Sequence, residues 1–309
     1  MRQPLLVVGA ARSGTTLVAQ RLLGAHPDVH YWSEPAFVWR YGNAYRLHDM
    51  LGADDARPHV AARIRSAFES KVAERPDALL VEKTPANCLR MPFVLSVLPD
   101  ARILHVVRDG RQVVRSAREE WAGRGGGALD SSQIRGLERR RRLAALVRRD
   151  IRWGERLLGP LSILELPAYL PRILGFLARQ VFQSDVFPWG PRFPGIVRAR
   201  WELGVLGAAA LQWQLCVLLT RSVCSALGSA RYREVAFERL QAQPEATLRE
   251  IQSFAGLADG DDWLGKSLEL LQPRSAHPAT GLTAEEVAYV ESIIGATLNE
   301  LGYPMGGVP

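Results

Sequence analysis

A short apolar run that leads directly into a glycine-containing loop constrains the fold of this chain more than any other feature. Leu5–Val8 is continuous and apolar, which is typical of a strand buried within a parallel sheet. A helical pattern follows from Gly14 to about Leu23. The loop between them, Gly9–Thr16, would direct backbone N–H groups and the positive end of the helix dipole at one point. This arrangement predicts an α/β fold whose first loop binds an anion.

The two glycines of this loop, Gly9 and Gly14, have the spacing of the Walker A motif. Thr15, however, stands where a nucleotide triphosphatase has the lysine that contacts the β- and γ-phosphates. The loop therefore favours phosphate binding without ordinary ATP or GTP hydrolysis. The glycines alone are also compatible with a plain strand-to-helix turn that binds nothing.

Further apolar runs extend the predicted sheet. Leu79–Val81 and Ile103–Val107 predict two more buried strands, and Tyr232–Phe237 is a weaker candidate. Each of the first two leads into a polar turn and a helical pattern, and this alternation is typical of βαβ units with a parallel sheet. Thr283 is expected to cap a last helix that ends near Leu301.

A different composition separates the two halves of this core. Residues from about 123 to 200 include a glycine-rich break, the arginine-rich run Arg135–Arg152 and a stretch rich in proline and aromatic residues. We interpret 123–200 as a helical insertion into a single domain that spans 1–309. The arginine run is more typical of a solvated helix face than of a site for an acidic substrate or a lipid surface. Trp189–Gly195 fits either the wall of a pocket or ordinary packing.

Charge and cysteine content exclude several classes of protein. The net charge of +7 favours anionic ligands, but no recognisable nucleic-acid-binding module accompanies it. The three widely spaced cysteines indicate structural thiols in a reducing compartment, and no His, Cys or Asp cluster has metal-ligand spacing. The apolar tracts Ile163–Leu177 and Leu203–Leu219 contain polar residues or prolines, so neither predicts a membrane-spanning helix. No signal-peptide pattern opens the sequence, which predicts a cytoplasmic protein and leaves peripheral membrane contact open.

A second phosphate-binding element follows the third predicted strand. Arg108 comes directly after Ile103–Val107, and Ser116 follows eight residues later in the next helical pattern. An arginine at the carboxyl end of a strand and a serine two turns into a helix can hold one phosphate together. Taken separately, a surface arginine and a helix serine are common.

Together these motifs resemble the sulfotransferases that use 3′-phosphoadenosine 5′-phosphosulfate (PAPS). Arg12–Thr16 is similar to their 5′-phosphosulfate loop, and Arg108 with Ser116 is similar to their 3′-phosphate pair. Glu82–Pro85 matches a motif of the bacterial branch, and this match places Lys83 on the catalytic lysine of the family. The resemblance is close over about residues 4–121 and looser over 230–303.

The resemblance also carries departures from the family pattern. Pro85 occupies the place where the cytosolic aryl sulfotransferases have a catalytic histidine, so the base must be another residue. The tyrosylprotein-type and many bacterial members use a glutamate after a His-Pro turn, a pattern that His26-Pro27 and Glu34 match. The alternative is that Glu34 only pairs with a neighbouring arginine such as Arg40. Phe237 stands where the family has a tyrosine near the adenine, and it can stack but not hydrogen-bond.

The resemblance implies a fold, a reaction and a set of site residues. The fold would be a three-layer α/β sandwich of the P-loop type with a mostly parallel sheet. The reaction would move a sulfuryl group from PAPS to a hydroxyl of a small-molecule, lipid or carbohydrate acceptor, without a required metal, giving adenosine 3′,5′-bisphosphate (PAP). A P-loop kinase and a non-catalytic nucleotide-binding protein are the alternatives. The implied catalytic residues are Glu34 and Lys83, and the implied donor-binding residues are Arg12, Ser13, Gly14, Thr15, Thr16, Arg108, Ser116 and Phe237.

Three further expectations rest on less specific signals. The apolar region from about 155 to 201 predicts a lid over the acceptor site, which would exclude water and suit a largely apolar acceptor. Arg274 and Ser275 are candidates for further contacts to the adenine and the 3′-phosphate. His105 lies within a predicted strand, which favours a core position over a catalytic one.

Overall fold

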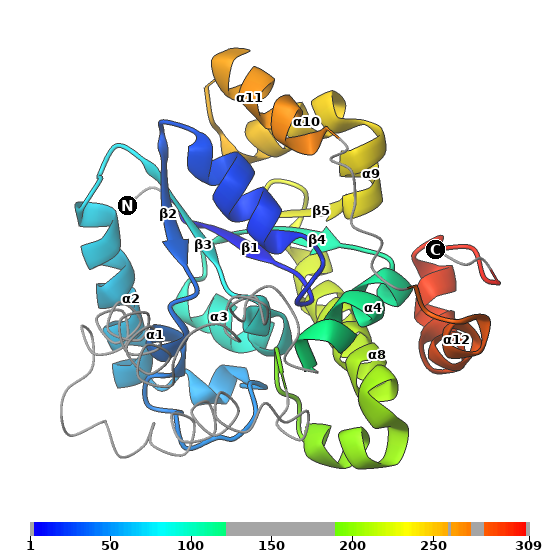
Figure 1. The fold of residues 1–309 in the computed structure, drawn as a ribbon. Helices are drawn as coiled ribbons and strands as arrows, with labels where there is room; N and C mark the ends of the chain where they lie inside the picture. Colours follow the sequence, from blue (N-terminus) through cyan, green and yellow to red (C-terminus); the bar gives the residue numbers. More distant parts are fainter. Residues whose placement is uncertain (1–2, 122–188, 259–260, 273–280, 307–309) are drawn as a thin grey trace, which may run out of the picture.

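A computed structural model describes residues 3–121, 189–258, 261–272 and 281–306. Its centre is one five-stranded sheet in the order β2-β3-β1-β4-β5, and all four strand pairings are parallel. The predicted α/β class with a mostly parallel sheet is confirmed (Figure 1). The strands are β1 (Leu5–Val8), β2 (Val29–Ser33), β3 (Leu79–Lys83), β4 (Arg102–Val107) and β5 (Tyr232–Ala236).

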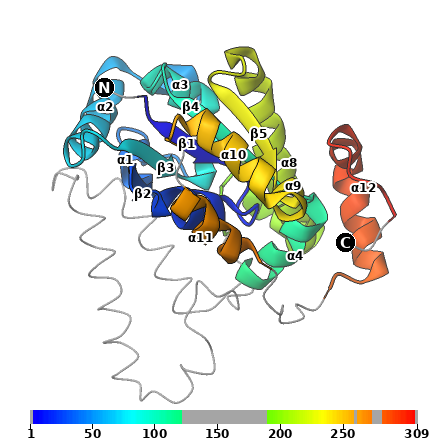
Figure 2. The same cartoon turned by 90° about the horizontal axis from the view of Figure 1, so that it is seen from above.

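The three central strands β3, β1 and β4 are buried on both faces, as their apolar runs predict, whereas the edge strands β2 and β5 are only partly buried. Leu5 and Val7 pack into one hydrophobic cluster, whereas Leu6 and Val8 pack into another on the opposite face. Successive side chains of a strand point to opposite faces, so helices must cover the sheet on both sides. The result is the three-layer sandwich expected from the sequence (Figures 1 and 2).

Helical elements form the two outer layers. The layer over one face contains η1 (Leu17–Leu22), η2 (Leu23–Ala25), α9 (Phe237–Ala242), α10 (Pro244–Ala255) and α11 (Asp261–Leu271). The layer over the other face contains α1 (Ala36–Arg40), α2 (Pro58–Ala73), α3 (Met91–Val97), α4 (Gly110–Trp121), α8 (Ile196–Cys224) and α12 (Ala284–Glu300). Short 3₁₀ turns are η3 (Ala53–Asp55), η4 (Pro85–Arg90) and η6 (Ser225–Leu227).

The helix after the first loop forms where the sequence predicts it, but its winding differs. Leu17–Leu22 is a π-helix, and Leu23–Ala25 continues it as a 3₁₀ turn. Single π-helical turns occur frequently beside functional sites. The hydrophobic pattern of the sequence locates a helix here but does not specify how wide its turns are.

The long helix α8 lies in the core against α4 and α12. By length and composition this helix is apolar enough to cross a membrane, but half of its most apolar stretch is buried inside the protein. The two glutamines that interrupt its apolar tract have partners inside the fold. Gln212 donates to the carbonyl oxygens of Trp189 and Pro191, and Gln214 donates to the Thr297 hydroxyl. These contacts are those of the core helix of a globular domain.

Most of the predicted insertion, the arginine run Arg135–Arg152 and the candidates Arg274 and Ser275 lie outside the described residues. The described end of the 123–200 region begins at Trp189, and its residues Phe193 and Ile196 are buried in the core. The end of that region therefore belongs to the core layer.

Three smaller expectations are confirmed. Thr283 caps α12 through a reciprocal capping box with Glu286. His105 is fully buried in β4, and its Nδ1 lies 3.0 Å from the Tyr232 hydroxyl. The three cysteines are buried free thiols.

Candidate active site

Every strand of the sheet delivers a residue of the predicted site at its carboxyl end. The Gly9 loop follows β1, Glu34 follows β2, Lys83 ends β3, Arg108 follows β4 and Phe237 follows β5. In parallel α/β sheets, ligands bind in the crevice outside the carboxyl ends of the strands. The topology therefore brings together residues that are far apart in the sequence.

A cavity of about 620 Å³ lies at this edge of the sheet, a size typical of small-ligand sites. Ser13 does not line it, because its side chain is buried within the loop. Phe237 lies behind the cavity and contacts Arg108 and Gly14. The predicted site residues that line the cavity are Arg12, Gly14, Thr15, Thr16, Glu34, Lys83, Arg108 and Ser116.

The loop after β1 is too tightly packed to carry larger residues at its glycines. A side-chain carbon at Gly9 would lie 2.4 Å from the Val106 carbonyl oxygen, and one at Gly14 would lie 2.3 Å from the Phe237 ring. The hydroxyl of Ser13 is buried and has no hydrogen-bond partner among the described residues. Thr15 and Thr16, which follow Ser13, do line the cavity, and hydroxyls beside the N–H groups of a helix N-terminus suit an anion. The loop therefore fits a phosphate or a sulfate.

The predicted 3′-phosphate pair lies beside this loop. Arg12 donates from Nε to the Ser116 Oγ at 2.8 Å, which leaves the hydroxyl hydrogen of Ser116 available to an anion. Arg108 donates from Nη1 to the Arg12 carbonyl oxygen at 3.2 Å. The guanidinium of Arg108 also lies over the Phe237 ring, 4.6 Å from its centroid. Two arginines and a serine therefore converge at one end of the cavity.

Glu120 lies in the same part of the cavity, and the sequence did not identify it as a site residue. Its Oε1 lies 3.1 Å from Nη1 of Arg12, and the residue lines the cavity. Glu120 is four residues after Ser116 in α4, so the two residues share one face of the helix. That spacing was a signal in the sequence that would have placed Glu120 beside Ser116.

Lys83 and Glu34 form an ion pair on the cavity wall. The Lys83 side chain is only 4% exposed, whereas that of Glu34 is 51% exposed. The backbone N–H of Glu34 donates to the Lys83 carbonyl oxygen at 2.9 Å, so β2 and β3 together fix both residues. Arg40, the alternative partner considered for Glu34, donates to Asp49 at 2.6 Å.

The backbone is strained at two of the predicted site residues. Within the described ranges, Arg12 with φ 77° and Glu34 with φ 43° are the non-glycine residues of positive φ. Each such conformation costs roughly 1–3 kcal/mol and tends to occur at functional sites. The surrounding fold, through the tight loop and the β2–β3 pairing, stabilises both residues in these conformations.

The cavity is also lined by Trp189, Gly190 and Pro191. Gln212 fixes this segment by donating to the Trp189 and Pro191 carbonyl oxygens at 2.8 and 2.7 Å. The sequence left open whether Trp189–Gly195 forms a pocket wall or packs in the core. Its first residues line the cavity, whereas Phe193 is buried in the core. This described end of the predicted lid lines the same cavity as Thr15.

A buried polar network lies directly beneath the lysine. Glu82 is fully buried and accepts hydrogen bonds from the Thr84 hydroxyl and, at 3.2 Å, from the Asn87 amide. Asn87 in turn accepts from Nε of Arg90 at 2.9 Å, and both Thr84 and Arg90 line the cavity. Burial away from water raises the pKa of Glu82 to about 7. The Glu82–Pro85 motif locates the lysine in the sequence but does not reveal this network.

The raised pKa of Glu82 predicts a pH-dependent stability. The folded protein holds this proton more tightly than the unfolded chain, so the free energy of unfolding should fall as the pH rises from about 4.5 to about 7. Glu82→Gln resembles the protonated carboxyl and should remove a fall on the order of 2 kcal/mol. Urea unfolding at pH 5 and pH 7.5 measures it. Glu69→Gln, at an exposed position of α2, should keep the wild-type pH dependence. An unchanged pH dependence in Glu82→Gln would contradict the assignment.

The chain is also similar in sequence to known proteins. A model described as "Sulfotransferase family" matches residues 4–167. The chain is 30% identical over 125 residues to the protein-tyrosine sulfotransferase of Drosophila melanogaster, which covers 37% of this chain and 25% of that protein. It is 31% identical over 124 residues to protein-tyrosine sulfotransferase 1 of Danio rerio, covering 37% and 35% of the two chains. The matched segment thus spans only about a quarter to a third of these relatives.

A solved structure shares the fold over a larger part of the chain. Sulfotransferase STF9 from Mycobacterium avium superposes with a TM-score of 0.52 over 99% of this chain and 78% of that chain, at 13% sequence identity. This likeness concerns the fold alone. Among the described residues, no group of three His, Cys, Asp or Glu side chains is arranged to hold a metal ion.

Proposed function

This chain belongs to the sulfotransferase family, and we propose that it transfers the sulfuryl group of PAPS to an acceptor hydroxyl. The products are a sulfate ester and PAP. One observation carries the proposal: the Lys83–Glu34 pair lines the same cavity as a phosphate-type loop and the Arg108–Ser116 pair. A donor held by the loop and by Arg108 would present its sulfuryl group toward an acid–base pair.

Different residues around the loop suit different groups of the donor. The loop N–H groups and the hydroxyls of Thr15 and Thr16 suit the 5′-phosphosulfate, because they meet the positive end of the following helix. Arg108 and Ser116 suit the 3′-phosphate, because a guanidinium and a hydroxyl make charge-assisted hydrogen bonds to phosphate oxygens. Phe237 does not line the cavity, and in this proposal its ring supports the Arg108 guanidinium from behind.

Lys83 and Glu34 carry the chemistry in this proposal. Glu34 takes the proton of the acceptor hydroxyl while the acceptor oxygen forms a bond to sulfur. The bond between sulfur and the bridging phosphate oxygen breaks at the same time, and Lys83 stabilises the negative charge that develops on that oxygen. Transfer of this kind depends on in-line positioning and on neutralisation of the leaving phosphate, as phosphoryl transfer does. The loop and the lysine supply both.

The acceptor occupies the part of the cavity that the donor leaves free. Trp189, Pro191 and Pro85 are apolar lining residues and support a hydroxyl on a largely apolar small molecule or lipid. The same cavity is also lined by the charged residues Arg40, Asp49 and Arg90, which suit polar groups of an acceptor. The relatives named as protein-tyrosine sulfotransferases support a tyrosyl hydroxyl as the competing acceptor.

Product analysis tests the proposal. The protein is incubated with PAPS and EDTA in parallel with a long-chain alcohol, a simple phenol, a tyrosine-containing peptide and a pool of host metabolites. We expect one acceptor class to gain the mass of a sulfuryl group, with one PAP released per product molecule. Adenosine 5′-phosphosulfate, which lacks the 3′-phosphate, serves as the control donor and should support little transfer. Binding of PAP without turnover on any acceptor would instead identify a nucleotide-binding protein.

A further inference from the structure

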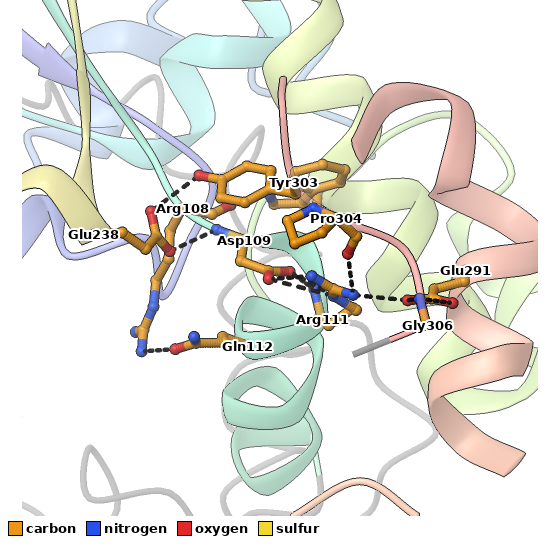
Figure 3. A network of polar contacts seen from close by, with 10 residues as sticks. Arg108, Asp109, Arg111, Gln112, Glu238, Glu291, Tyr303, Pro304 and Gly306 are labelled. Atoms are coloured by element: carbon orange, nitrogen blue, oxygen red, sulfur yellow. Dashed lines mark hydrogen bonds and ion pairs between the residues drawn. The ribbon is translucent and has the colours of Figure 1, made fainter. Parts of the chain in front are cut away.

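The segment Tyr303–Gly306 lies against the loop that presents Arg108, although the two are far apart in the sequence (Figure 3). Three contacts fasten the segment. The Tyr303 hydroxyl donates to Oε2 of Glu238 at 2.9 Å, and the Pro304 carbonyl oxygen accepts from Nη1 of Arg111 at 2.9 Å. The Gly306 N–H donates to Oε1 of Glu291 at 3.2 Å.

Glu238 links this segment to the loop that carries Arg108. While its Oε2 accepts from Tyr303, its Oε1 accepts from the backbone N–H of Asp109 at 2.9 Å. Asp109 is the residue after Arg108, so Glu238 fixes the backbone from which the Arg108 side chain extends. Glu238 also follows Phe237, whose ring lies beneath the Arg108 guanidinium.

Arg111 holds the same loop from the other side. Its guanidinium donates to the Asp109 carboxylate, with the shortest contact at 2.7 Å, and it also pairs with Glu291 at 2.7 Å. Arg111 and Asp109 are both buried, so this pairing is little screened by water. Asp109 is therefore held through its backbone by Glu238 and through its side chain by Arg111.

The charge of Glu238 also acts on Arg108 itself. Burial lowers the pKa of the Arg108 guanidinium, and the negative charge of Glu238 is the largest influence that opposes this shift. Nη2 of Arg108 also donates to the side-chain oxygen of Gln112 at 2.8 Å. The backbone carbonyl oxygen of Arg108 accepts from the Trp213 indole at 3.0 Å. Arg108 is thus held in one position at the cavity by neighbours from several elements.

We propose that Tyr303 and Glu238 are positioning residues that fix Arg108 for recognition of the donor's 3′-phosphate. The inference rests on the proposed function, because the 3′-phosphate is the group that Arg108 would bind. Loss of the Tyr303 hydroxyl leaves one Glu238 oxygen without its donor, and Glu238 then reorients and releases the Asp109 N–H. Charge-assisted hydrogen bonds to phosphate depend on geometry, so a shift of Arg108 weakens binding of 3′-phosphorylated nucleotides selectively.

The test compares PAP with AMP by calorimetry on Tyr303→Phe. We expect the affinity for PAP to fall about tenfold, whereas the affinity for AMP, which has no 3′-phosphate, stays within about twofold. In steady-state assays, the KM for PAPS should rise and kcat at saturating donor should change little. Tyr289→Phe is a matched control, because the Tyr289 hydroxyl donates to the Leu203 carbonyl oxygen at 2.8 Å and does not line the cavity. That control should change neither affinity.

A pair of substitutions at Glu238 separates positioning from charge. Glu238→Gln keeps an oxygen for the Asp109 N–H and a polar partner for Tyr303, so it should retain the PAP-to-AMP preference within about threefold. Glu238→Ala removes both contacts and should lose that preference at least as strongly as Tyr303→Phe. The retained preference in Glu238→Gln would be the rescue that hydrogen-bond positioning predicts.

The outcomes distinguish this inference from the proposed function. A wild-type protein that binds PAP and AMP equally would overturn the proposed donor and, with it, the role of Arg108. A wild-type protein that prefers PAP, together with a Tyr303→Phe variant of the same preference, would overturn only the positioning role. An equal loss of PAP and AMP affinity in Tyr303→Phe, or a lowered Tm with unchanged affinities, would indicate a purely structural tyrosine and would also overturn it.

Discussion

Replacing Glu34 by glutamine should lower kcat by about a hundred- to ten-thousand-fold, the usual effect of removing a general base. Glutamine keeps the shape of the side chain and can still accept a hydrogen bond from Lys83, but it cannot take a proton. The affinity for PAP should therefore stay nearly unchanged, since no donor-binding contact is lost. Single-turnover rates at saturating acceptor, combined with calorimetry of PAP binding, measure the two effects separately.

The chain contains a matched control for this substitution. Glu74 pairs with Lys71 through Nζ at 2.5 Å, as Glu34 pairs with Lys83, but it does not line the cavity. Glu74→Gln should therefore leave kcat unchanged. Near-full turnover by Glu34→Gln at saturating acceptor would show that another group takes the proton.

Replacing Lys83 by alanine should lower kcat by about a hundred- to a thousandfold, comparable to the loss of one preorganised donor at a developing negative charge. Lys83 is almost completely buried and pairs with Glu34, so no solvent cation can take its place easily. The affinity for PAP should also fall, because the ammonium lies on the wall of the cavity that we propose to bind the donor. Steady-state kinetics with PAPS, together with PAP titrations, measure both losses.

Lys71→Ala is the matched control, because Lys71 also pairs with a glutamate, Glu74, but does not line the cavity. It should leave kcat and the affinity for PAP unchanged. In the proposed mechanism, Lys83 and Glu34 act on one reaction step as a contacting pair. The double variant Glu34→Gln/Lys83→Ala should therefore lose much less than the product of the two single losses. A fully multiplicative loss would contradict a joint role.

The parts of the site that the sequence predicted are those with a local signal. The apolar runs Leu5–Val8 and Leu79–Val81, and the run Ile103–Val107 that only His105 interrupts, located the three central strands. The residues directly after each run therefore lie at the carboxyl end of a strand. β2 was missed because Val29–Ser33 contains His30, Tyr31 and Trp32, which are only partly buried and form no continuous apolar run. The position of Glu34 beside Lys83 follows from the pairing of β2 with β3, which no local pattern specifies.

The contacts that the sequence did not predict join distant segments. Gln212 reaches back to Trp189 and Pro191, and Tyr303 reaches Glu238, because the fold places their elements together. A single sequence contains no signal for such pairs, since each residue alone is compatible with a solvent-exposed position. Burial of Glu82 is a similar case, because the motif that contains it does not reveal which side chains surround it.

The most direct test of this account measures PAP and AMP binding to the wild-type protein by calorimetry in the presence of EDTA. Arg108 and Ser116 would each contribute a hydrogen bond to the 3′-phosphate, and AMP would leave both without that partner. We expect PAP to bind at least about a hundredfold more tightly than AMP. Equal affinities for the two nucleotides would contradict the assignment of this cavity as a PAPS site.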